Sequence, residues 1–173
     1  MEKTLALVKP DGVENNHIGE ILYYYEKAGL KIKALKMIKI NKEFARQHYI
    51  DLKDKPFYGE LVDFISRSPL VALILEGEDA VNKVRGINGA TDPKDAKEGT
   101  IRHKYAKDKT ENTVHGSDSV ENAKREISMW FPEFLDSYLD TSKIDKSYSS
   151  FIGCFLFLSM HRSIILKHLY LGL

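Results

Sequence analysis

The stretch NTVHGSDS, residues 112–119, places one histidine among residues that suit phosphate chemistry. His115 follows two β-branched residues that favour an extended backbone, and Gly116 then permits a turn. The next run, residues 120–130, has helical spacing, and the free N–H groups at a helix N-terminus attract anions. A lone histidine is more often structural or exposed, so the rest of the sequence must decide whether this imidazole interacts with phosphate.

Three side chains before that helix can cap its first turn: Ser117, Asp118 and Ser119. Asp118 and Glu121 also have the spacing of a capping box, in which two residues satisfy backbone N–H groups reciprocally. The sequence therefore predicts a capped helix directly after the histidine.

Strands and helices alternate along the rest of the chain. Apolar runs predict strands over residues 4–8, 30–40 and 70–75, with a short fourth strand over residues 112–115. Helical spacing predicts helices over residues 18–28, 42–52, 57–66, 80–87 and 120–130. Residues 70–75 are apolar throughout, which is typical of a central strand. Lysines alternate with apolar residues in 30–40, which indicates a strand with one wet face.

A long loop is expected before the last strand, because residues 88–110 are polar and lack periodicity. A turn is expected at residues 9–12, Lys-Pro-Asp-Gly. Three longer strands and a short fourth, interleaved with helices, predict the α+β class and a sandwich of the βαββαβ kind.

Composition and charge restrict the classes of function. The 173 residues are 43% apolar and 29% charged, which is ordinary for a soluble domain with a real core. The formal charge of +1 gives no bulk attraction to nucleic acid, so no such partner is expected. The single cysteine, Cys154, excludes an internal disulfide and suits a reducing, cytoplasmic location. The first residues lack the long apolar run of a secretory signal, and none is expected.

The C-terminal part differs from the rest. We place a domain at residues 1–137 and an extension at residues 138–173, which begins polar and becomes strongly apolar after residue 150. A bilayer needs about 20 apolar residues, and Arg162 near the centre would cost about 2.5–3.5 kcal/mol. A spanning helix is therefore marginal. Docking on the domain, a subunit contact and an interfacial membrane helix remain equally open.

Several segments, in the same order, resemble the nucleoside diphosphate kinases. They are VKPDGV (8–13), HYIDLKDKPFYGELVDFI (48–65), GATDP (89–93), GTIR (99–102) and NTVHGSDSVENAKREI (112–127). The resemblance runs over residues 2–133 without large gaps. It implies a ferredoxin-like domain with a four-stranded antiparallel sheet. It also implies transfer of the γ-phosphoryl group of a nucleoside triphosphate to a nucleoside diphosphate, by a ping-pong route through a phosphohistidine.

Imidazole suits such a two-step transfer, because it is nucleophilic near neutral pH and its phosphoramidate stays reactive. The resemblance makes His115 the nucleophile, phosphorylated on its pros nitrogen. It implies that Glu126 and Ser117 orient the imidazole, the usual task of a carboxylate beside a working histidine.

Phosphoryl transfer leaves the protein mainly the placing of groups and the stabilisation of charge. The resemblance puts the cations Lys9, Arg85 and Arg102 at the phosphates, with the hydroxyl of Thr91 as a donor to the same oxygens. It also places Tyr49 close to Lys9. Magnesium is expected to arrive with the nucleotide, with no metal held by the protein itself.

The nucleoside is expected to bind by stacking. The resemblance makes Phe57 the platform for the base, Leu61 the apolar wall of the cleft and Asn112 the residue that hydrogen-bonds the sugar. Because every base has a π-face, stacking accepts a broad range of nucleotides. The remaining histidines have no metal-ligand spacing and are given no role: His17, His48, His103, His161 and His168.

The sequence departs from the family pattern at two places. After GTIR stand His103 and Lys104, where the family has a small residue and an acid; the change either tightens nucleotide binding or breaks a structural contact. Residues 109–111 are also more charged than usual, which affects the expected contacts to the base edge.

Two other functions remain as alternatives: a nucleotide-binding regulatory protein with weak turnover, and a membrane-tethered variant of the enzyme. The family usually assembles as hexamers or tetramers. Pro93 matches a loop proline at the hexamer contact, so a homohexamer is favoured, with a tetramer as the alternative.

Overall fold

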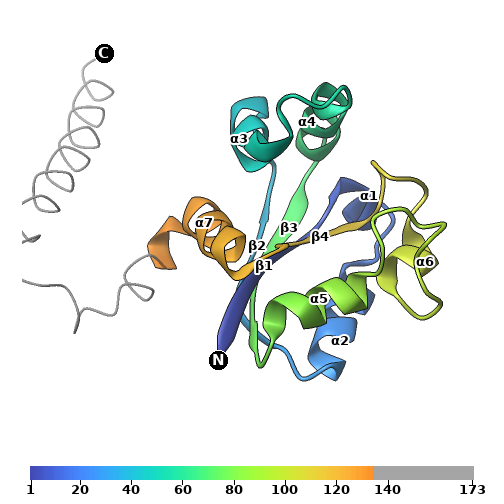
Figure 1. The fold of residues 1–173 in the computed structure, drawn as a ribbon, viewed down its shortest axis with the longest axis vertical. Coiled ribbons are helices and arrows are strands. Elements are labelled where there is room, and N and C mark those ends of the chain that lie inside the picture. Colours follow the sequence, from blue (N-terminus) through green and yellow to red (C-terminus); the bar gives the residue numbers. More distant parts are fainter. Residues whose placement is uncertain (135–173) are drawn as a thin grey trace, which may run out of the picture. The chain divides into compact units, whose positions relative to one another are not determined.

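The sheet that carries the site has four antiparallel strands in the order β2-β3-β1-β4 (Figure 1). The computed structural model describes residues 1–134. The strands are β1 (Glu2–Val8), β2 (Lys31–Ile38), β3 (Leu70–Gly77) and β4 (Val114–Gly116). The α+β class and the βαββαβ order are therefore confirmed. The prediction of a central position for residues 70–75 is also confirmed, because β3 lies between two other strands.

Helices connect and cover the strands. They are α1 (Pro10–Glu14), α2 (Ile18–Lys27), α3 (Lys42–His48), α4 (Tyr58–Ser66), α5 (Ala80–Asn88), α6 (Ile101–Tyr105) and α7 (Val120–Trp130). Short 3₁₀ turns stand at Ile50–Leu52 and Pro132–Phe134. Helices α2 and α5 pack on one face of the sheet, with Tyr25 and Val84 in a core that includes Val8 and Leu73. On the other face α7 packs against β1, and Trp130 of α7 contacts Phe44 of α3.

Some boundaries differ from the prediction, each for a local reason. The helix predicted over residues 42–52 ends at His48, and a 3₁₀ turn follows it. The predicted loop 88–110 contains α6, which is too short to give a periodic signal and buries only Ile101. The turn predicted at residues 9–12 begins a short helix with Pro10 in its first turn.

The helix after the histidine has its predicted bounds, but the cap differs. Ser119 is the N-cap, and its hydroxyl accepts a hydrogen bond from the backbone N–H of Asn122 at 3.1 Å. Asp118 stands one residue too early to be the cap and instead accepts a hydrogen bond from the Asn122 side chain. The capping box of Asp118 and Glu121 is thus replaced by a Ser119 cap, one of the three candidates.

A β-bulge changes the faces of the edge strand β2. The pairing with β3 shifts between Ile32 and Ala34, and such an extra residue exchanges the two faces beyond it. After the bulge, Lys36 lies over the ring of Phe131, while Leu35 and Met37 are 48% and 57% exposed. The prediction of lysines on the wet face therefore holds only before the bulge.

None of the helices within residues 1–134 combines the length and the apolar character that crossing a bilayer requires. The predicted boundary at residue 137 and the extension 138–173, with Cys154 and Arg162, lie outside the described residues.

Candidate active site

A cleft of about 650 Å³ gathers residues that are far apart in the sequence. Except for Ser117, all the predicted site residues line it: Lys9, Tyr49, Phe57, Leu61, Arg85, Thr91, Arg102, Asn112, His115 and Glu126. Ser117 is fully buried and contacts the cleft only through Glu126. The elements that meet here are the ends of β1 and β4, the segment after α3, the helices α4 to α7 and the loop before β4.

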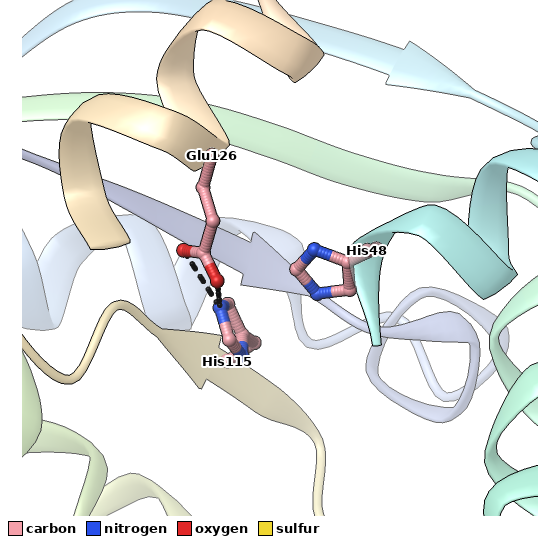
Figure 2. A group of neighbouring side chains, drawn as sticks. All are labelled: His48, His115 and Glu126. Atoms are coloured by element: carbon pink, nitrogen blue, oxygen red, sulfur yellow. Dashed lines mark hydrogen bonds and ion pairs between the residues drawn. The ribbon is translucent and has the colours of Figure 1, made fainter. Parts of the chain in front are cut away.

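His115 lies in β4, opposite Leu7 of β1, and its side chain is 22% exposed. Its Nε2 atom is 3.2 Å from each carboxylate oxygen of Glu126 in α7 (Figure 2). A carboxylate can only accept, so Nε2 carries the proton of the neutral ring. The other nitrogen, Nδ1, therefore keeps a lone pair.

Glu126 is a buried carboxylate that stays ionised. Burial acts to raise its pKa, but the hydrogen bonds from His115 and Ser117 and the two nearby imidazoles lower the pKa to about 2. The hydroxyl of Ser117 donates to the same carboxylate at 2.6 Å. Glu126 is therefore ionised at neutral pH, and it fixes both the tautomer and the orientation of the His115 ring.

Lys9 is a buried cation at the end of β1. Its ammonium group donates to the backbone oxygen of Thr110 and to Oδ1 of Asn112, both at 2.7 Å. Burial lowers the pKa of Lys9 to about 7, although the nearby Asp11 carboxylate acts in the opposite direction. An anion in the cleft would oppose the effect of burial, because it stabilises the protonated form.

The two arginines differ in what holds them. Arg102 donates to the backbone oxygens of Gly89 at 2.7 Å and Val114 at 2.8 Å, and so joins the loop after α5 to β4. Arg85 extends from the exposed face of α5, and within residues 1–134 its guanidinium has no hydrogen-bond or ion-pair partner. Arg85 is thus a free cation at the cleft.

Part of the cleft lining is apolar and exposed. Phe57 is 45% exposed at the start of α4, and Leu61 lies one turn further along. Tyr49 lines the same cleft, and burial raises the pKa of its phenol, so its hydroxyl can still donate a hydrogen bond at neutral pH. A flat aromatic group can rest on the exposed ring of Phe57.

The charged residues that depart from the family pattern have partners within the protein. Lys104 pairs with Glu20, and His103 contacts the backbone oxygen of Ala96 at 3.0 Å, so neither lines the cleft. In the loop before β4, Glu111 pairs with Arg67 at 2.5 Å and Lys109 with Asp92 at 3.1 Å. His103 and Lys104 thus make structural contacts away from the cleft.

Asp11, which the sequence predicts only as a turn residue, supports the strand of His115. Its Oδ2 accepts hydrogen bonds from the backbone N–H of Thr113 at 2.9 Å and from the Thr113 hydroxyl at 3.1 Å. Thr113 has φ +68°, a left-handed conformation that costs about 1–2 kcal/mol for such a residue. No sequence signal indicates this contact, because it joins residues a hundred positions apart.

His48, to which the sequence assigned no role, lies beside His115. Their ring centroids are 4.7 Å apart at an interplanar angle of 75°. Possible ligand atoms of His48, His115 and Glu126 all lie within 4.8 Å of one another, which is the one such group of potential metal ligands among residues 1–134 (Figure 2).

The fold and the cleft define a class of protein: an α+β sandwich with a histidine and several cations around one nucleotide-sized cleft. The nucleoside diphosphate kinase family model matches residues 2–135. A nucleoside diphosphate kinase of Clostridium perfringens is 60% identical over 133 residues, which is 77% of this chain and 93% of that protein. One of Caldanaerobacter subterraneus is 54% identical, over 78% of this chain and 97% of that protein. The chain belongs to the nucleoside diphosphate kinase family.

Solved structures give the same result. A crystal structure of the Aquifex aeolicus nucleoside diphosphate kinase matches with a TM-score of 0.73 at 44% identity, over 75% of this chain and 94% of that one. A nucleoside diphosphate kinase family protein from Babesia bovis matches with a TM-score of 0.74 at 45% identity, over 77% and 90%. The ferredoxin-like four-stranded fold is therefore shown.

The support that Asp11 gives to Thr113 can be tested by mutation. Asp11→Ala removes the acceptor of two hydrogen bonds and should lower the free energy of unfolding by about 2–3 kcal/mol, because hydrogen bonds to a charged group are lost from a buried site. Asp11→Asn keeps one acceptor oxygen and should cost less than about 1.5 kcal/mol. Urea unfolding measures both variants. An alanine variant as stable as the wild type would contradict this account.

Proposed function

We propose that the chain transfers the terminal phosphoryl group of a nucleoside triphosphate to a nucleoside diphosphate, with His115 as the temporary acceptor. The observation that carries this proposal is the pair of nitrogens on His115. Nε2 lies at hydrogen-bond distance from an ionised carboxylate, and Nδ1 therefore keeps a lone pair in a cleft lined by cations.

In the first half-reaction, Nδ1 attacks the γ-phosphorus, the Nδ1–P bond forms, and the bond from phosphorus to the bridging oxygen breaks. The nucleoside diphosphate leaves with that electron pair. The ring becomes positive, and Glu126 stabilises it through the bond to Nε2. In the second half-reaction, a terminal oxygen of another diphosphate attacks the same phosphorus, and the neutral ring of His115 is restored.

The cations would stabilise charge on the phosphoryl oxygens during transfer. Arg85 is free to move onto a phosphate, while Arg102 is already held beside β4 by backbone oxygens. Lys9 would add a third positive charge, with Thr91 and Tyr49 as hydroxyl donors. Arg102 would thus be a fixed cation of the site, and Arg85 would be a cation that adapts to the bound nucleotide.

The nucleoside would bind on the apolar side. The base would stack on Phe57 against Leu61, and the sugar would reach Asn112, whose amide also holds the backbone of Thr91 and Lys109. Stacking does not read the base edge, which supports a broad range of nucleotides.

Magnesium would enter on the nucleotide phosphates. The carboxylates lining the cleft are committed elsewhere: Asp51 pairs with Arg125, Asp118 bonds Asn122, and Glu126 bonds His115. They do not form an oxygen cage for Mg²⁺, which in any case prefers phosphate oxygens and water. When bound, the ion would supply positive charge between the phosphates.

A regulatory protein that binds nucleotides but turns over slowly is not favoured. Such a protein would be expected to lack part of the machinery, whereas Lys9, Arg85, Arg102, Asn112 and His115 all meet in one cleft. The near-neutral charge gives no support for a nucleic-acid partner. We place the protein in the cytoplasm, because its single cysteine suits a reducing compartment. A membrane contact made by the extension 138–173 is compatible with this function.

The role of His115 predicts a covalent intermediate. Incubation with γ-labelled ATP, followed by an alkaline quench, should give an acid-labile phosphoprotein. His115→Ala should remove this adduct and reduce ATP–GDP exchange by roughly 10³-fold or more while urea unfolding stays close to wild type. His17→Ala is the matched control, because His17 stacks on Tyr105 and does not line the cleft. A labelled adduct on the alanine variant at position 115 would refute the role.

The buried state of Lys9 predicts proton uptake on binding. With its pKa near 7 in the free protein, Lys9 is mostly neutral at pH 8, and bound phosphates raise that pKa. ADP binding at pH 8 should therefore take up most of one proton, and affinity should rise as the pH falls from 8 to 7. Calorimetry in two buffers of different ionisation enthalpy measures the uptake. Lys9→Met should abolish it, and equal uptake by wild type and variant would contradict the assignment.

We further propose that the chain forms a homohexamer, with a tetramer as the alternative. The exposed apolar residues Leu35 and Met37 on the edge strand β2 support an association surface. Pro93 supports the hexamer through its family resemblance alone. Light scattering on the full chain and on a chain ending at residue 137 should give six copies in each case. A monomeric full chain would contradict the proposal, and a smaller assembly only after truncation would assign the contact to the extension.

A further inference from the structure

A buried N–H group without a partner lies next to His115. His48 is 3% exposed, and its Nδ1 atom accepts a hydrogen bond from the indole Nε1 of Trp130 at 3.2 Å. The other ring nitrogen, Nε2, is inaccessible to solvent and has no hydrogen-bond partner within residues 1–134. A buried polar atom without a hydrogen-bond partner destabilises the folded state, so the presence of this atom calls for an explanation.

Trp130 determines which nitrogen of His48 carries the proton. An indole N–H can only donate, so Nδ1 of His48 must offer a lone pair, and the proton of the neutral ring must be on Nε2. Burial, aided by the nearby His115 ring, lowers the pKa of His48 to about 3. His48 is therefore a neutral ring with one fixed N–H bond.

The N–H bond is located beside the face of the His115 ring. Figure 2 shows His48 above that face, with a nitrogen-bearing edge directed at it. The edge-to-face arrangement has centroids 4.7 Å apart and an interplanar angle of 75°. Because Nε2 of His48 is closed to solvent, a phosphate oxygen is also too large to reach it without rearrangement, so His48 can act only through His115.

The same cluster has the spacing of a metal site, but its hydrogen bonds oppose one. A metal needs a lone pair on each imidazole nitrogen that binds it. Trp130 keeps the proton on Nε2 of His48, and Glu126 keeps the proton on Nε2 of His115. Both nitrogens that face the cluster are donors, which makes His48 a source of a fixed dipole and not a ligand.

We propose that His48 is a positioning residue for phosphotransfer: its Nε2–H, fixed by Trp130, directs a positive dipole end at the His115 ring and favours the neutral, phosphoryl-accepting imidazole over the imidazolium. The proposal rests on the nucleophilic role of His115. It accounts for the unpartnered atom, since an N–H group directed at an electron-rich ring face keeps a weak interaction of its own.

Glu126 and His48 act on the His115 ring in opposite senses. The carboxylate at 3.2 Å orients the ring and attracts positive charge on it, whereas the positive end of the His48 N–H dipole repels such charge. The proposed dipole would therefore offset the charge effect of Glu126 without disturbing the orientation that Glu126 gives.

Other charged or titratable groups around His115 belong to every neighbouring element. They are Lys9 after β1, Tyr49 after α3, Arg85 in α5, Arg102 in α6, and Asp118 and Arg125 beside and in α7. Asp51 also lines the cleft but is paired with Arg125, and Lys109 is paired with Asp92. These charged groups are the same in the wild type and in the variants. A comparison of variants that differ only at His48 or Trp130 therefore isolates the dipole.

The kinetic experiment measures phosphoprotein formation by the full chain as a function of pH. His48→Phe keeps a flat ring but removes the N–H group, so the acidic half-maximal pH should rise by roughly 0.5–1 unit. Trp130→Phe keeps His48 but frees its tautomer, and should shift the profile in the same direction. His17→Gln, a histidine outside the cleft, should leave the profile unchanged. A uniform loss of rate at all pH values in the first two variants would show a packing role and overturn the proposal.

A spectroscopic experiment on the wild-type protein does not depend on the variants folding. Nitrogen-15 NMR should show His48 as the neutral Nε2–H tautomer from pH 5 to 8 (about 2 units above its pKa at the lower limit). An Nδ1–H tautomer or an imidazolium would overturn the proposal. So would binding of Zn²⁺ alone that is lost in His48→Phe, because binding needs a lone pair on Nε2. If the proposed function itself fails, the wild type will form no acid-labile adduct at any pH. If only the role of His48 fails, the wild type will still form the adduct.

Discussion

The hydrogen bond between Nε2 of His115 and the carboxylate of Glu126 is the contact on which the chemistry of the site depends. It assigns the ring proton to one nitrogen and leaves the lone pair on the other, in a cleft that is also lined by cations. It works only because Glu126 is buried and still ionised, with Ser117 donating to the same carboxylate. A carboxylate in solvent would give neither a fixed ring orientation nor a fixed tautomer.

That contact requires His115 to be held firmly, although its strand is short. β4 is only Val114–Gly116 and pairs with a single neighbour, β1. Asp11 holds Thr113 in a left-handed conformation just before the strand. Gly116 follows the histidine where a Cβ atom would stand 2.7 Å from Val84 of α5. His115 is therefore positioned from both sides by tertiary contacts, and strand length contributes little.

Much of this arrangement could be predicted from the sequence. Periodicity predicted the long helices and strands, and the histidine motif with the other family segments predicted the residues that line the cleft. What could not be predicted depends on contacts distant in sequence. Asp11 looks like an ordinary turn residue, and His48 like any core histidine, until the fold brings them beside Thr113 and His115. Helix α6 is too short for a periodic signal, and the bulge in β2 exchanges faces that simple alternation would keep. Local patterns cannot encode these features.

The loop before β4 shows how an unusual sequence can leave the chemistry of a site intact. Its charged residues stand where contacts to a base edge were expected, yet Glu111 pairs with Arg67 and Lys109 with Asp92. Arg67 also pairs with Glu14 at the end of α1, so the ion pairs tie the loop to the segment that carries Asp11. These charges hold the loop in place, and the ring of Phe57 stays 45% exposed. The proposed stacking of a base on this ring would discriminate little among bases, so the charge changes in this loop are compatible with a broad nucleotide range.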